Sequence, residues 1–270
     1  MTTDTTPARP AAPGPAPHPD PDPDLAGYAL RLGDDALVLC QRLCGWITRA
    51  PTIEEDLALS NIALDLLGHA RTLLSYSGQR DGTGRGDDDL AYRRTEREFR
   101  HVLLVELPDP DFAATVVRQL VFSHYAGLLY TALADCADPV LSGFGTRAAA
   151  EVEYHRMHAA QWTVRLGRGT TESRRRMTTA LDALWPYTDE LFEEDGPSTR
   201  LDAAGTAVAP ARLRDAWQRE TAAVLATAGL AVPAPRWRAT GGRAGLHTEA
   251  FAPLLAEFQS VHRQYPGGTW

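Results

Sequence analysis

A small set of carboxylates and histidines has the residue types and the spacing that metal chemistry needs. Asp65 is followed four residues later by His69, and Glu151 is followed four residues later by His155. Each pair stands within a helical pattern, so its two side chains lie about one turn apart. Helical bundles hold pairs of iron ions with carboxylates and histidines at about this separation on facing helices. A di-iron site is therefore the first hypothesis to test.

The ligand pattern for such a site is incomplete. A ferritin-like di-iron site takes a carboxylate from each of two helices and Glu-x-x-His from each of the other two. Gly68, which has no side chain, stands three residues after Asp65. His69 comes one residue late, which turns it about 100° away on an ideal helix. The helix expected over 111–135 has no acidic residue between its two ends. The expected site therefore lacks ligands on at least two helices.

We interpret this position as a degenerate metal site. Only Glu151 and His155 still share a helix face, and Arg118 stands on the helix that lacks its carboxylate. A guanidinium there can replace the metal charge by pairing with Asp65 or Glu151. We therefore expect a buried cluster of Asp65, Arg118, Glu151 and His155 with a structural role, and no metal or catalytic residue in this chain. Breaking a buried ion pair of this kind costs about 3–5 kcal/mol.

The composition sets the class of protein. The chain has 270 residues, of which 44% are hydrophobic and 23% charged, which is typical of one large globular domain with appendages. A net charge of −8 argues against general binding to nucleic acid or to an anionic membrane. No apolar run reaches the roughly 18 residues of a membrane span, and the N-terminus has no secretory apolar region. Three cysteines form no even framework, which indicates core thiols in a reducing cytoplasm.

The helix that positions Asp65 is the clearest element in the sequence. Thr52 and Glu55 have the spacing of a capping box, in which each side chain reaches the backbone of the other. Apolar residues then recur at intervals of three and four, which predicts one broad buried face. The members of this face are Leu59, Ile62, Ala63, Leu66, Leu67, Ala70, Leu73 and Leu74.

The rest of the chain predicts an all-α fold, because no segment alternates with period two for long enough to form a strand. Residues 1–24 are rich in Pro, Ala and Asp, so we expect a disordered tail followed by one domain over 25–270. The expectation is a ferritin-like four-helix bundle with extra peripheral helices. The bundle helices are expected at 28–49, 52–77, 111–135 and 140–166. Peripheral helices are expected at 90–106, 170–186, 210–228 and 247–264, with loops at 77–89, 196–209 and 230–245.

Several long segments resemble a known family. They are YALRLGDDALVLCQRLCGWITRAP, DLALSNIALDLLGHAR, LLVELP with DFAATVVRQ, EVEYHRMH and TGGRAGLHTE. Together they look like the C-subunit family of the bacterial ring-1,2-phenylacetyl-CoA epoxidases, also called phenylacetate-CoA oxygenases. The similarity covers about residues 27–270. It implies a non-catalytic structural subunit that pairs with a similar A subunit, in which the di-iron centre lies.

The resemblance also implies a reaction and a ligand. The complex is expected to convert phenylacetyl-CoA to its 1,2-epoxide, with electrons from NADPH through a reductase that carries flavin and iron–sulfur centres. The C-type chain is expected to help hold the CoA ester. The positions that match the family pattern for this contact are Glu98, Phe99, Arg100, His101, Thr199, Arg200 and Leu201. Two alternatives stay open, a competent di-iron carboxylate oxidase and an independent CoA-ester-binding protein.

Overall fold

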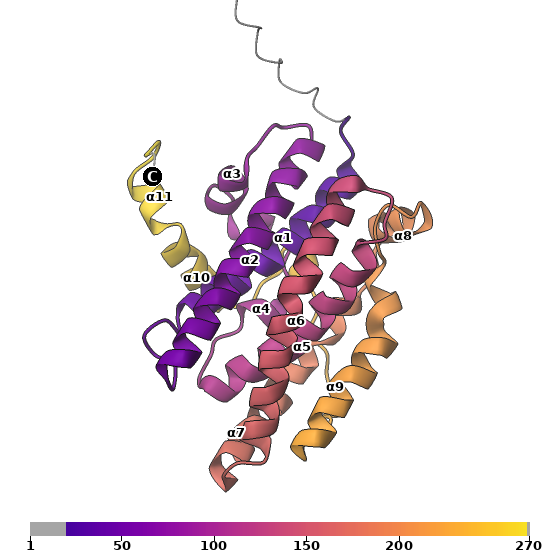
Figure 1. The fold of residues 1–270 in the computed structure, drawn as a ribbon. Helices are drawn as coiled ribbons and strands as arrows, with labels where there is room; N and C mark the ends of the chain where they lie inside the picture. Colours follow the sequence, from indigo (N-terminus) through magenta and orange to yellow (C-terminus); the bar gives the residue numbers. More distant parts are fainter. Residues whose placement is uncertain (1–19, 269–270) are drawn as a thin grey trace, which may run out of the picture.

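Four long helices form the body of the molecule. The computed structural model describes residues 20–268, and no strand occurs among them. The bundle helices are α1 (Pro23–Cys44), α2 (Ile53–Arg80), α5 (Phe112–Leu133) and α6 (Pro139–Gly167). Helix α1 packs along α2, α5 packs along α6, and α2 lies beside α6 (Figure 1). The predicted all-α, ferritin-like four-helix bundle is confirmed.

The two ends of α1 differ from the expected helix at 28–49. Asp22 caps the helix by accepting from the backbone N–H groups of Asp24 and Leu25, and Pro23 occupies the first turn, where its missing N–H costs nothing. The folded part therefore begins within the expected tail, and the rest of that tail, residues 1–19, lies outside the described residues. At the other end, Gly45 follows the last helical residue, earlier than expected.

Helix α2 begins at the predicted cap, but the cap has only one of its two halves. The Thr52 hydroxyl accepts from the Glu55 N–H at 3.4 Å. The Glu55 carboxylate does not return to Thr52, because it instead contacts Nε2 of His158 on α6 at 2.7 Å. The predicted apolar face is buried except for Leu67, which lies at its edge.

Helix α5 is the most buried of the four. Asp111 caps it by accepting from the Ala114 N–H at 3.0 Å, at the start of the expected range. Its neighbour α6 begins at Pro139 behind the Asp138 cap, one residue before the expected range. Helices α7 (Thr171–Leu184) and α9 (Arg214–Ala228) cover α5 and α6 from outside. Within the described residues, no helix combines the length and the apolar character that a membrane crossing requires.

The segment expected as a helix at 90–106 is broken into three short pieces, so that prediction is wrong. They are α3 (Asp87–Tyr92), the 3-10 helix η1 (Glu96–Glu98) and α4 (Leu103–Glu106). The backbone is extended between them because long-range bonds replace helical ones. The N–H groups of Arg100 and Val102 each donate to an aspartate of α1, at 2.8 Å.

Two other peripheral predictions also need correction. The loop expected at 196–209 contains helix α8 (Gly196–Ala203), which Asp195 caps and which packs against α1. The helix expected at 247–264 is two shorter ones, α10 (Phe251–Phe258) and α11 (Ser260–Gln264). The remaining short elements are the 3-10 helices η2 (Trp185–Tyr187), η3 (Asp189–Phe192), η4 (Pro210–Leu213) and η5 (Gly242–Ala244).

Buried His124 on α5 gives the fold a predictable acid sensitivity. Burial lowers the pKa of His124 to about 4, although its hydrogen bond to the Leu120 carbonyl opposes this. The unfolded ring titrates near 6.5, so the unfolded state binds more protons than the folded state between pH 6.5 and 4. Stability is therefore complete above pH 6.5 and falls as the pH drops toward 4, by about 3 kcal/mol from this group. Urea unfolding of His124→Gln should show a decline smaller by this amount, and an unchanged decline would contradict the assignment.

Candidate functional site

Three histidine–carboxylate pairs join α2 to α6, and we call them the α2–α6 ladder. Nε2 of His158 lies 2.7 Å from Glu55, Nε2 of His155 lies 3.0 Å from Asp65, and Nε2 of His69 lies 2.7 Å from Glu151. The three rings are buried, whereas the carboxylates of Asp65 and Glu151 are partly exposed. The ladder thus places three imidazole rings inside the bundle and two of their three carboxylate partners near its surface.

His69 is the residue of this site that the sequence analysis missed. The ideal helical angle turned it away from the other ligands, but the bundle interior lies on that side. Its ring packs edge-on against Tyr130 and Phe144, with centroids 5.5 Å away in both cases. Burial lowers the pKa of His69, and the neighbouring Glu151 opposes that shift. Burial likewise lowers the pKa of His155, opposed by Asp65.

Arg118 does not belong to this cluster, so that part of the prediction is wrong. Its buried guanidinium donates to the Leu107 carbonyl and to the Asp109 carboxylate. These acceptors lie in the loop before α5, close to the start of the helix that carries Arg118. The structure thus brings together Asp65, Glu151 and His155, as predicted, with His69 in place of Arg118.

The carboxylates of α1 are also committed elsewhere. Asp34 pairs with the buried Arg94 at 2.9 Å, and Asp35 pairs with Arg243 at 2.7 and 3.0 Å. Burial raises the pKa of Asp35, and Arg243 opposes that shift. Both aspartates lie in the middle of α1, away from the first turn, where a helix dipole favours negative charge.

These residues do not fit a di-iron centre. A ferritin-like centre draws ligands from all four bundle helices. Here α5 offers no carboxylate, the two central aspartates of α1, Asp34 and Asp35, are paired with arginines, and only α2 and α6 have carboxylates beside histidines. The ladder atoms already bond one another in pairs. That the chain carries no iron stays a prediction, and its test is given below.

The ladder predicts a modest loss of stability for Glu151→Ala. The Nε2 of His69 would lose its acceptor at a position that water can reach, so the free energy of unfolding should fall by about 1 kcal/mol. Glu151→Gln keeps an acceptor oxygen and should retain most of the stability. Urea titration measures both. The exposed Glu153→Ala, on the same helix, is the control and should stay within about 0.5 kcal/mol of the wild type.

The first segment expected at the CoA ester is partly buried. Phe99 and His101 are inside the protein, and Glu98 caps η1 by accepting from the Thr95 N–H at 2.7 Å. The Arg100 guanidinium donates to two carbonyls of its own segment, those of Arg97 and Phe99, at 2.7 and 2.8 Å.

The second expected segment lies in α8. Leu201 is buried, and the Thr199 hydroxyl donates to the Asp195 carbonyl. Arg200 is exposed and pairs with Asp24 at 2.8 Å, near the start of α1. Since Arg100 bonds Asp34, ten residues further on, the two segments contact α1 about 15 Å apart. They do not form one compact site.

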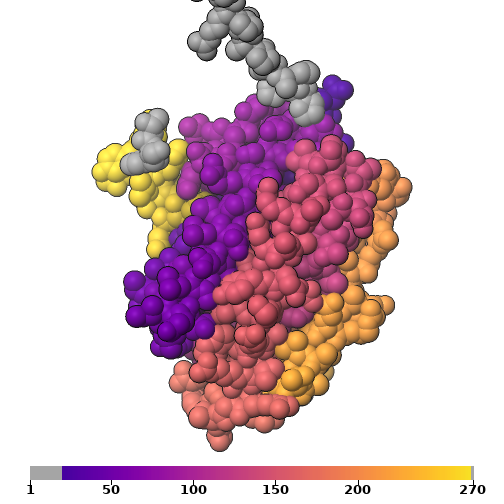
Figure 2. All heavy atoms as spheres, viewed as in Figure 1, coloured from indigo at the N-terminus to yellow at the C-terminus, as the bar shows by residue number. Residues whose placement is uncertain are grey.

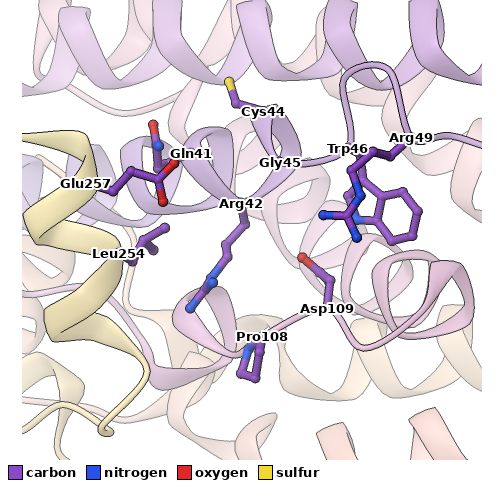
Figure 3. Close-up of a pocket in the computed structure, with 10 residues that line it drawn as sticks. All are labelled: Gln41, Arg42, Cys44, Gly45, Trp46, Arg49, Pro108, Asp109, Leu254 and Glu257. Carbon is purple, nitrogen blue, oxygen red and sulfur yellow. The ribbon is translucent and has the colours of Figure 1, made fainter.

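A surface pocket that the sequence did not indicate lies at the end of α1 (Figure 3). It has a volume of about 360 Å³, between the end of α1, the 108–109 turn and α10. Arg42 crosses its floor and donates to the carbonyls of Glu106 and Ala250, the latter at 3.2 Å. Two arginines and two carboxylates balance its charge. The lining residues are Gln41, Arg42, Cys44, Gly45, Trp46, Arg49, Pro108, Asp109, Leu254 and Glu257.

The thiols near this pocket are free. Cys40 is buried, as expected of a core residue, but Cys44 is exposed at the pocket and Cys136 is partly buried. None of the three forms a disulfide.

The bundle and the α2–α6 ladder define a ferritin-like helical protein in which histidine–carboxylate pairs join two of the four bundle helices. The chain matches the family model described as "Phenylacetic acid catabolic protein" over residues 12–270, and it belongs to that family. It is 45% identical over 246 residues to the C subunit of 1,2-phenylacetyl-CoA epoxidase from Escherichia coli (strain K12). The match covers 91% of this chain and 99% of that relative. The resemblance seen in the sequence is confirmed.

Proposed function

We propose that this chain is a structural subunit of a cytoplasmic phenylacetyl-CoA 1,2-epoxidase and has no catalytic metal site of its own. The observation that carries the proposal is the retained bundle with its di-iron ligand set replaced. The two central aspartates of α1, Asp34 and Asp35, pair with arginines, and α5 has no carboxylate at all. A chain of this kind supports a catalytic partner by shape and by binding. The di-iron centre would lie in the partner A subunit.

The whole complex would insert one oxygen atom from O₂ into the aromatic ring of phenylacetyl-CoA. Electrons would come from NADPH through a separate reductase with flavin and iron–sulfur centres. This part of the proposal rests on the family relationship and on the name of the E. coli relative.

The exposed side of α2 is the best candidate for the surface that meets the A subunit. We call Ile53, Leu57, Leu64 and Leu67 the α2 stripe. The first three are 77%, 61% and 64% exposed. Their spacing of four, seven and three follows the heptad pattern of a helix that packs against another helix. Single exposed apolar side chains are ordinary, but four that share one side of a helix are typical of a protein interface.

The neighbouring α6 extends this surface. Tyr154 and Met157 of α6 are exposed beside α2, and α2 and α6 lie side by side on the face turned toward the viewer in Figure 2. Open hollows of about 320 and 500 Å³ lie between the two helices, near the two ends of the ladder. A second helical bundle can place side chains in these hollows while it covers the α2 stripe.

The two predicted CoA segments fit a supporting role in ligand binding. Arg100 and Arg200 supply the positive charge that a nucleotide phosphate requires, although each now bonds groups of this chain. Because Phe99, His101 and Leu201 are buried, we expect their contribution to come through backbone groups. We also expect Glu98 and Thr199 to contribute through backbone groups, because their side chains already have partners within this chain.

Iron analysis with and without the co-expressed A-type subunit tests the proposal on one size-exclusion run. We expect an iron-free chain that elutes in a larger complex with an iron-bearing partner. Stoichiometric iron in this chain alone would overturn the proposal and favour the di-iron oxidase. Failure to associate, with CoA-ester binding by the chain alone, would favour the independent binding protein.

A further inference from the structure

Three titratable side chains meet inside the protein, away from the α2–α6 ladder. They are His101, Glu106 and His247. Nε2 of His101 lies 2.6 Å from Oε2 of Glu106, and Nδ1 of His247 lies 2.8 Å from the same oxygen. Among residues 20–268, no other group of three His, Cys, Asp or Glu side chains brings its donor atoms within 4.8 Å of one another. All three side chains are fully buried.

The surrounding structure holds these groups in place. The Thr248 N–H donates to Oε1 of Glu106 at 2.6 Å, and Nε2 of His247 lies 3.2 Å from the Phe99 carbonyl. The two imidazoles stack with centroids 4.2 Å apart, and the Phe251 ring packs against both. Outer contacts of this kind are what fix carboxylate and histidine ligands around a metal ion.

The backbone near the cluster is packed tightly as well. A Cβ atom at Gly242 would lie 2.3 Å from the His101 carbonyl oxygen, so only glycine allows the C-terminal segment to approach this closely. That segment delivers His247 to the cluster. The backbone around His247 is partly exposed, but its ring is fully buried.

Hydrogen bonds alone satisfy this arrangement poorly. Two N–H groups would share one carboxylate oxygen, and the Thr248 N–H occupies the other. His247 would need a proton on each nitrogen, because Nδ1 faces a carboxylate and Nε2 faces a carbonyl. An imidazolium and a carboxylate would then be buried as a pair, and the desolvation penalty of such a pair can exceed the attraction within it.

We propose that His101, Glu106 and His247 bind one divalent transition-metal ion, with Zn²⁺ as the best fit. On binding, the ion would take the place of the Nδ1 proton of His247, which would be released, and the proton of His101 would move from Nε2 to Nδ1, so both rings would be neutral. Nε2–H of His247 would keep its bond to the Phe99 carbonyl. Two imidazoles and a carboxylate are a ligand set that zinc favours, whereas Mg²⁺ and Ca²⁺ prefer oxygen alone. Metal–ligand bonds of about 2.0–2.2 Å require the donor atoms to separate by roughly half an ångström.

The proposed ion would have a structural role. It would join the C-terminal segment to the 99–106 segment, and it would lie outside the four bundle helices that hold ferritin-like iron. Aromatic rings surround it, and no described pocket opens onto all three ligands. The metal site uses the side chain of His101, whereas the proposed CoA contact uses its backbone, so failure of the metal site would leave the proposed function unchanged.

Cobalt titration of the full-length, untagged, chelator-treated protein tests the site. We expect one Co²⁺ per chain with visible absorption bands, displaced by one Zn²⁺. His101→Gln and His247→Gln should each weaken binding by at least about 100-fold. The matched control is His69→Gln, which removes another buried histidine with a glutamate partner and should bind Co²⁺ like the wild type.

The outcomes separate a built site from a purely hydrogen-bonded cluster. Zn²⁺ should raise the melting temperature of the wild type and of His69→Gln, but not that of His101→Gln. If His247→Gln fails to fold, His101→Gln decides, since Glu106 keeps its bonds to His247 and Thr248 in that variant. Absence of the cobalt bands in the wild type, or binding that survives both substitutions, would overturn the proposal.

Discussion

Replacing Arg243 with alanine is expected to lower the free energy of unfolding by about 3–5 kcal/mol, the largest single effect on stability that we predict. The guanidinium holds both carboxylate oxygens of Asp35, at 2.7 and 3.0 Å. It also donates to the carbonyls of Arg31 and Arg100, at 3.1 and 2.9 Å. One side chain from the C-terminal segment thus ties α1 to the extended stretch before α4.

The size of the effect comes from the charge that remains. The side chain of Asp35 is 2% exposed, and without Arg243 its remaining contact is the Val102 N–H, at 2.8 Å. A buried carboxylate without a counter-charge costs far more than the pair contributes when intact. Burial already raises the pKa of Asp35, and loss of the guanidinium raises it further. A carboxyl with a raised folded pKa is less destabilising at low pH, so the penalty of Arg243→Ala should shrink as the pH falls toward 4.

Urea unfolding at pH 7.5 and pH 5 measures this penalty. Arg238→Ala is the matched control, because Arg238 also pairs with an aspartate but is 72% exposed, and its loss should cost less than about 1 kcal/mol. In the double variant Asp35→Asn with Arg243→Ala, the buried charge is gone, so it should be more stable at pH 7.5 than Arg243→Ala alone. An Arg243→Ala penalty no larger than the control's would show that the buried pair does not hold these segments together.

Helix boundaries set by contacts within one turn could be predicted from the sequence, whereas those set by distant residues could not. The first residues of α5 and α6 could be predicted because the Asp111 cap and Pro139 act within one helical turn. The failure at 90–106 has the opposite cause. Its arginines have helical spacing, but Arg94 turns inward to Asp34, sixty residues earlier, and the backbone breaks to allow it. No local pattern carries that information.

The candidate site divides in the same way. The sequence placed Asp65, Glu151 and His155 in one site because their spacing puts them on facing helices. Arg118 instead pairs with Asp109, which is nearer to it in the chain. The sequence alone did not show whether Arg118 would pair with Asp109, Asp65 or Glu151. His69 was excluded from the expected ligands because the ideal helical angle turns it away from them. Its imidazole nevertheless reaches Glu151 on α6.

Leu64→Asp is expected to abolish stable association with the A-type subunit while the chain stays folded. Leu64 is 64% exposed and lies in the α2 stripe, so in the free chain the new carboxylate meets water, and stability should change by less than about 0.5 kcal/mol. Within an interface the same carboxylate would be buried without a partner. Loss of a central apolar anchor together with that cost weakens binding by about 2–4 kcal/mol or more.

Size-exclusion chromatography and calorimetric titration with the A-type subunit measure the loss. Val261→Asp is the control, because Val261 is also exposed but belongs to α11, which lies on another side of the molecule (Figure 1). If Val261→Asp disrupts the complex and Leu64→Asp does not, the partner covers the C-terminal side, and α2 needs another explanation for its exposed heptad row. If only Leu64→Asp disrupts it, the partner lies over the ladder. The half-exposed carboxylates of Asp65 and Glu151 then become buried on association, and their paired histidines supply the compensation that a dry interface requires.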